Sequence, residues 1–202
     1  PEARAPPAPP ALRAPVAPAA APRRDRRMLY LAGGVLGVLL VGAVVVFAAV
    51  ALGFPEKYVL DDDEMPPGMS NARLSSSELR DAGMSRNPGP IDWDRSVFAD
   101  GFAQTGADDP KEAHGQVLAA GAARIVILAM QYPNEDEARD AAQQMRTICS
   151  FGGRAGVQAV VLRDEDVVVV VMSGEGATRA QVSAVASALT EKVEDLSRVC
   201  ST

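Results

Sequence analysis

The sequence predicts an α+β protein with a single N-terminal transmembrane helix, followed by an extracytoplasmic domain in the order β-α-β-β-α. Three observations support this prediction. Residues 28–54 form an uncharged apolar run. Residues 123–132 and 157–174 have the β-branched, apolar composition of buried strands. Residues 134–150 and 178–200 carry apolar side chains at helical spacing, so strands and helices alternate along the second half of the chain.

The run from Met28 to Phe54 contains no charged residue and no Asn, Gln or Pro over 27 positions. As a helix with a rise of 1.5 Å per residue it would extend roughly 40 Å, which exceeds the bilayer's hydrocarbon core of about 30 Å. The apolar part of a signal peptide has only about 7–15 residues. A soluble helix would show a polar stripe, which this run lacks. We therefore expect a retained transmembrane helix.

Charges on the two sides of this run predict its orientation. Residues 1–27, a tail rich in Pro, Ala and Arg, hold six arginines against two acidic residues, whereas Asp61 to Glu64 follow the run. Basic residues stay on the cytoplasmic side, so we expect a cytoplasmic N-terminus and a periplasmic or extracellular C-terminal part in the inner or plasma membrane. The tail carries +4 of the net charge of −6, which leaves −10 on the remainder. Such an acidic exterior part argues against a nucleic-acid partner.

Residues 55–118 are interrupted by Pro and Gly, as expected for a stalk and wrapping segment. Ser75 to Glu78 have the pattern of a capped helix start. Asp109-Pro110 suggest a second helix start, with Pro at the first helical position. The composition of the chain, with 17 Arg and 3 Lys, is typical of a GC-rich bacterial genome.

Residues 119–202 form the predicted extracytoplasmic domain. Its strands are expected at 123–132, 157–164 and 166–174, and its helices at 134–150 and 178–200. This order is that of a ferredoxin-like or split β-α-β sandwich. We expect both helices to cover the same face of the sheet, with their C-terminal ends close together.

The two cysteines lie at those helix ends. Cys149 ends the first predicted helix and Cys200 ends the second. Outside the cytoplasm, an even number of cysteines in such an arrangement favours a disulfide, here closing a loop of about 50 residues. The alternative is a pair of buried free thiols.

The strand Val167 to Met172 is apolar at every position, and Ile125 to Met130 are apolar at both odd-numbered and even-numbered positions. Side chains alternate between the two faces of a strand, so both faces must be covered. We expect residues within 72–118, around Trp93 and Phe98, to cover the face away from the helices, with a partner subunit as the alternative cover.

No motif for catalysis, cofactor binding or metal binding is recognisable, and no motif identifies a family. The single histidine, His114, has no Ser in a G-x-S-x-G pattern to activate, and we expect it to be a surface or capping residue. The Gly-rich stretches 152–156 and 174–178 lack the Lys-Ser/Thr of a phosphate loop and are expected to be turns. The acidic run 61–64 lacks the spacing of a calcium loop and is expected to be solvated.

The predicted span has small residues suited to helix packing. They follow a small-x-x-x-small pattern that allows two backbones to approach, and they are Gly33, Gly37, Gly42, Ala49 and Gly53. Gly and Ala are also common in membrane spans generally, so this pattern alone leaves both readings open.

These observations favour a non-enzymatic single-pass accessory or structural subunit of a larger membrane complex, for example an energy-converting one. Its partners would be the lipid bilayer and other membrane subunits, and no cofactor is expected. The alternative is a membrane-anchored extracytoplasmic sensor or ligand-binding module, which would need a pocket. A third hypothesis is an anchored hydrolase that uses His114 with a serine.

Overall fold

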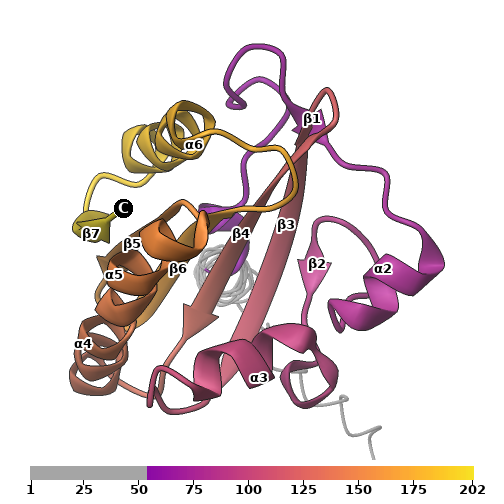
Figure 1. Ribbon diagram of the computed structural model, residues 1–202. Coiled ribbons are helices and arrows are strands. Elements are labelled where there is room, and N and C mark those ends of the chain that lie inside the picture. Colours follow the sequence, from indigo (N-terminus) through magenta and orange to yellow (C-terminus); the bar gives the residue numbers. More distant parts are fainter. Residues whose placement is uncertain (1–53) are drawn as a thin grey trace, which may run out of the picture. The chain divides into compact units, whose positions relative to one another are not determined.

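The computed structural model describes residues 54–202, without the side chains of 151–155, as an α+β domain built on one antiparallel sheet (Figure 1). The predicted span lies outside these residues apart from Phe54, and so do the five small residues assigned to helix packing. Among the helices of residues 54–202, none has the length and apolar character needed to cross a membrane.

The sheet runs in the order β1-β3-β4-β6-β5-β7, and β2 also pairs with β3. All neighbours are antiparallel. The strands are β1 (Ser70–Asn71), β2 (Gly89–Pro90), β3 (Glu112–Ala120), β4 (Ala123–Gln131), β5 (Ala159–Asp164), β6 (Val167–Ser173) and β7 (Ser197–Ser201). The segment before residue 119 thus contributes three strands to the same sheet.

Short helices connect these strands. They are η1 (Glu56–Tyr58), α2 (Ser76–Asp81), η2 (Trp93–Arg95), α3 (Val97–Ala103), α4 (Glu135–Gln144), α5 (Arg146–Ala155) and α6 (Arg179–Lys192). Their starts follow the capping rules. Ser75 and Thr178 form capping boxes with Glu78 and Gln181, and the Asn134 side chain accepts a hydrogen bond from the Glu137 amide.

The second half of the chain contains two overlapping split β-α-β units. β4 and β5 are parallel with β6 between them, and β6 and β7 are parallel with β5 between them. Both connections advance across the sheet in the same direction, but they start from strands that run in opposite directions. Because β-α-β crossovers are right-handed, the helices of the two units must lie on opposite faces.

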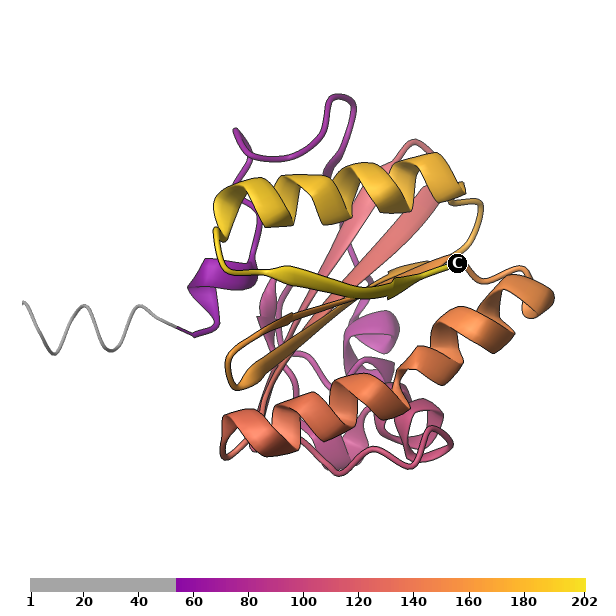
Figure 2. The same cartoon turned by 90° about the vertical axis from the view of Figure 1, so that its left-hand side faces the viewer.

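Figure 2 shows this arrangement, with α6 on one side of the sheet and α4 and α5 on the other. The expectation that both helices cover the same face is therefore wrong. The cause is the final strand, which the sequence analysis did not include. The helix expected over 178–200 ends at Lys192, and residues 197–201 form β7 beside β5.

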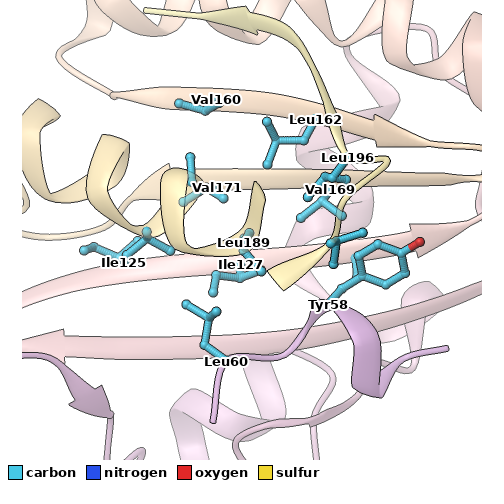
Figure 3. Close-up of a cluster of buried hydrophobic side chains, with 14 of the residues drawn as sticks. Tyr58, Leu60, Ile125, Ile127, Val160, Leu162, Val169, Val171, Leu189 and Leu196 are labelled. Atoms are coloured by element: carbon cyan, nitrogen blue, oxygen red, sulfur yellow. The ribbon is translucent and has the colours of Figure 1, made fainter. Parts of the chain in front are cut away.

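The sheet is buried on both faces, as the apolar strands predicted. The first core, on the α6 face, joins β4, β5 and β6 to α6 and to Tyr58 and Leu60 (Figure 3). The second core, on the α4–α5 face, contains Met84, Trp93 and Phe102. The expected cover from residues 72–118 is thus present, with Phe98 packed at its margin, but it shares its face with α4 and α5.

Cys149 in α5 and Cys200 in β7 form a disulfide, with their Cα atoms 6.3 Å apart. The predicted pairing is confirmed, although its predicted geometry is not. The bond ties a helix to the edge strand of the sheet instead of joining two helix ends.

Candidate functional site

A polar groove of about 490 Å³ lies on the α6 face, beside β3. One wall is the chain from Glu56 to Asp61, and the other is the turn at residues 86–88. His114 of β3 lies between them. We call this hollow the His114 groove.

β3 directs His114 toward this groove. Residues 114, 116 and 118 point to the same face of the strand because side chains alternate. Leu118 belongs to the core on the α6 face, and Gln116 holds the chain that runs over this face. Gln116 bonds to the backbone of Leu60, whose N–H donates to Oε1 at 2.9 Å and whose carbonyl accepts from Nε2 at 2.8 Å. Its Nε2 also donates to Asn71 Oδ1 at 2.9 Å.

The opposite wall is fixed by Asn87. Its Nδ2 donates to the carbonyl oxygens of Ala72 at 2.9 Å and Val117 at 2.7 Å, and its Oδ1 accepts from the Val117 N–H at 2.8 Å. This side chain therefore satisfies the backbone of β3 in the gap between β1 and β2. These three hydrogen bonds attach the turn that carries Arg86 to Val117 of β3 and to Ala72.

Residues 54–64, which we call the entry segment, are also held by charged groups. Asp164, only 4% exposed, accepts hydrogen bonds from Tyr58 Oη and Lys57 Nζ, both at 2.7 Å. Burial raises the pKa of Tyr58 well above its usual value, and the hydrogen bond to Asp164 raises it further. The phenol therefore remains a donor at any physiological pH.

Lys192, at the end of α6, supplies a third attachment of the entry segment. Its Nζ donates to the Val59 carbonyl at 2.7 Å and to Glu64 Oε2 at 2.6 Å, and it lies 3.6 Å from Asp61 Oδ2. The acidic run is therefore only partly solvated. Asp61, Asp62 and Asp63 are exposed, whereas the Glu64 carboxylate is half-buried and paired.

His114 is 8% exposed, so the expectation of a surface or capping residue is wrong. Within residues 54–202 its ring forms no hydrogen bond to the protein. Burial lowers the pKa of His114 to about 4, and the positive charge of Arg86 acts in the same direction. The ring is therefore neutral at pH 7, with one nitrogen able to donate and the other able to accept.

The charged groups of the groove are divided between its walls. Arg86 lies on one wall, and Glu56 and Asp61 lie on the other. Arg86 and Glu56 are exposed, and neither forms an ion pair with another residue of the described chain. Asp61 is partly neutralised by Lys192. The groove thus offers a cationic side and an anionic side around a neutral imidazole.

A second hollow, of about 530 Å³, lies around β2 and the turn after α2. Its lining includes Arg80, Met84, Ile91, Asp92 and Arg95, and Arg95 is paired with Asp92 at 3.5 Å. No polar side chain of comparable burial lines it. Between residues 54 and 202, no group of three or more His, Cys, Asp or Glu side chains has the geometry to hold a metal ion.

Of the predicted site residues, the two cysteines lie in the described part of the chain and are bonded to each other, and neither lines the groove. The roles of Arg86, Asn87 and Gln116 were not predicted from the sequence. The only available signal was the composition of residues 85–90, a polar turn between Gly and Pro residues. Comparisons with protein-family models, with curated proteins and with solved structures gave no match.

Proposed function

We propose that this protein is a non-catalytic, single-pass accessory subunit of a larger membrane complex, with residues 55–202 on the extracytoplasmic side. One observation carries the proposal. The predicted span ends at Phe54, and Phe54 already packs against the core on the α6 face, with its ring centroid 6.0 Å from that of Tyr58. Within the described residues, the folded domain therefore begins at the last residue of the predicted span.

The energetics of the entry segment support a rigid attachment. Tyr58 is 4% exposed and Leu60 is fully buried. Burial of each such side chain contributes about 1.5–3 kcal/mol. Hydrogen bonds to charged partners, such as those of Asp164 and Lys192, contribute about 1.5–3 kcal/mol each. A span joined to this segment would hold the domain in a fixed position next to the bilayer, as a subunit that docks against neighbours requires.

The chemistry of the groove argues against the third hypothesis, a hydrolase that uses His114 with a serine. Such a mechanism needs the nucleophilic hydroxyl or thiol within hydrogen-bond reach of its base. The residues that line the His114 groove include no Ser, Thr or Cys, and both cysteines are in the disulfide.

The small residues of the predicted span offer the test of this proposal. Gly33, Gly37 and Gly42 would be replaced together by Leu, with Val44→Leu and Val46→Leu as the matched control in the same span. Both chains should insert into the membrane. The control should co-purify with the same membrane proteins as the wild type in mild detergent, whereas the Gly-to-Leu chain should lose them. Unchanged co-purification, or no stable companion of the wild type, would contradict the proposal.

Orientation is tested separately. Protease added to intact spheroplasts should remove the C-terminal domain, because the arginines before residue 28 are expected to remain in the cytoplasm. Full protection of the domain would contradict the proposed topology.

A second candidate function is that of a membrane-anchored ligand-binding module. The His114 groove favours it, because the groove combines a suitable volume with a buried polar group that has no protein partner within residues 54–202.

A further inference from the structure

We propose that the His114 groove binds a small zwitterion, with its anionic group at Arg86, its ammonium group at Glu56, and a hydrogen bond to the His114 ring between them. This proposal rests on the second candidate function and names its ligand class. It does not require that the accessory-subunit proposal be correct.

The groove exists before any ligand binds. Asn87 fixes one wall through three hydrogen bonds, and Gln116 fixes the other through the backbone of Leu60. Lys192 adds a contact to the carbonyl of Val59. A ligand therefore needs to order few protein groups, which reduces the entropic cost of binding.

The His114 ring provides the groove with hydrogen-bonding nitrogens that no described protein group uses. It is more than nine-tenths buried, and within the described residues no protein group hydrogen-bonds to it, although it lines the groove. The ring nitrogens are not among the fully enclosed polar atoms of residues 54–202, so they remain accessible from the groove. A ligand with both donor and acceptor atoms would bond to them there.

The division of charge selects the ligand class. A guanidinium presents a planar fork of donors that suits a carboxylate or phosphate, and a carboxylate suits an ammonium. Arg86 and Glu56 lie on opposite walls and form no ion pair with each other or with other described residues. A simple anion would leave the acidic wall unused, and a simple cation would leave Arg86 unused. A molecule with both charges uses both walls.

Two sources share this chemistry, a soluble zwitterion and the headgroup of a zwitterionic phospholipid. Glu56 follows the end of the predicted span by two residues. If that span crosses the bilayer, the groove lies at headgroup level, and a phosphoethanolamine headgroup would supply both the phosphate and the ammonium.

The first experiment titrates O-phosphoethanolamine into the full chain in a non-ionic detergent by isothermal titration calorimetry. We expect saturable binding at one site, weakened at least tenfold by Arg86→Gln. Arg80→Gln, which removes an exposed arginine lining the other hollow, is the matched control and should leave the affinity within twofold.

Two further arms define the chemistry. Glu56→Gln should weaken O-phosphoethanolamine at least fivefold but leave inorganic phosphate unchanged, because only the ammonium contacts this side chain. His114→Gln, with an unchanged circular dichroism spectrum, should weaken the binding of both probes.

Lipid discs separate the two sources of the ligand. If discs containing phosphatidylethanolamine suppress binding of the soluble probe and phosphatidylcholine discs do not, the ligand is the lipid headgroup. Equal binding in the two kinds of disc identifies a soluble zwitterion.

The proposal is overturned if the wild type shows no saturable binding of O-phosphoethanolamine. It is also overturned if Arg86→Gln and Arg80→Gln weaken binding equally. These measurements use the isolated full chain, so they are independent of whether the protein co-purifies with other subunits.

Discussion

The two faces of the sheet are closed in different ways. On the α6 face, the entry segment is attached by polar contacts between residues more than 50 positions apart, among them Tyr58 with Asp164 and Leu60 with Gln116. On the α4–α5 face, aromatic side chains such as Trp93 and Phe102 pack at 5.7 Å between ring centroids, and a disulfide anchors α5. Both faces have an apolar core, to which the α6 face adds directed hydrogen bonds and the α4–α5 face adds a covalent bond.

This difference has a functional meaning. Apolar contacts are non-directional and tolerate adjustment, whereas a buried carboxylate or amide requires its partners in place. The polar contacts therefore occur where the structure must fix one particular segment, the chain that follows the predicted span. The groove lies on this same face and shares its supports.

The largest expected effect tests whether both faces are closed. Val169 and Val170 are both fully buried and belong to the α6 and the α4–α5 core, respectively. Val169→Asp and, separately, Val170→Asp should each lower the free energy of unfolding by about 4 kcal/mol or more, because each buries an unpaired carboxylate. Thermal unfolding followed by circular dichroism measures this. A variant that stays folded and as stable as the wild type would show that its face is open.

The next effect concerns the α4–α5 face alone. Cys200→Ser removes a cross-link between residues separated by 51 positions, and the loss of loop constraint should cost about 4 kcal/mol of unfolding free energy. Urea unfolding of the oxidised wild type and the variant gives the difference. Non-reducing mass mapping of the native protein should find the two cysteines in one cross-linked peptide pair. Alkylation of both thiols in the oxidised protein would contradict the bond.

The third prediction uses pH to probe the α6 face. Since the pKa of His114 is about 4 in the folded chain and about 6.5 when unfolded, the unfolded state binds the proton more readily. The contribution of the neutral His114 ring to the free energy of unfolding is fully present above pH 6.5 and is lost as the pH falls toward 4. This loss amounts to about 3 kcal/mol.

His114→Gln should remove that part of the acid sensitivity, while the contributions of Glu56, Asp61 and the other carboxylates remain. Urea unfolding at pH 7, 5.5 and 4 makes the comparison. Identical pH profiles for the wild type and the variant would mean that the ring is not buried in its neutral form.

The smallest effect concerns the attachment of the entry segment. Asp164→Asn keeps the size of the side chain but removes the charge that faces Lys57 and Tyr58, and it should cost about 1–2 kcal/mol. Limited proteolysis should then cut within residues 54–69 before the rest of the domain. Glu165→Gln, at an exposed neighbouring position, is the control and should leave the cleavage pattern unchanged. Equal protection of the two variants would place the attachment elsewhere.

The sequence predicted the elements that have strong local signals. β4, β5 and β6 each contain an apolar run of four or more residues, and α4 has an Asn cap and an acidic first turn. β3 was missed, because its sequence includes His, Gly and Gln and follows Asp109-Pro110, which resembles a helix start. β3 is specified instead by pairing with β4 over its whole length, a non-local contact.

The end of α6 was misjudged for a related reason. Val193, Leu196 and Val199 continue the helical spacing of the preceding turns, yet the chain becomes extended at Val193 and then pairs with β5. The groove could not be derived from local patterns, since its walls depend on hydrogen bonds between residues 30 and 56 positions apart. No short window of sequence contains both members of such a pair.

The side chain of Asn87, which replaces a strand residue along β3, is also protected against chemical ageing. Asparagine loses its amide when the backbone nitrogen of the next residue attacks the side-chain carbonyl and closes a five-membered imide. The next residue here is Pro88, whose nitrogen carries no hydrogen and cannot form a neutral imide. Conversion to aspartate would replace a donor by an oxygen facing the carbonyls of Ala72 and Val117. The proline thus blocks the imide route to the loss of an amide that supports this edge of the sheet.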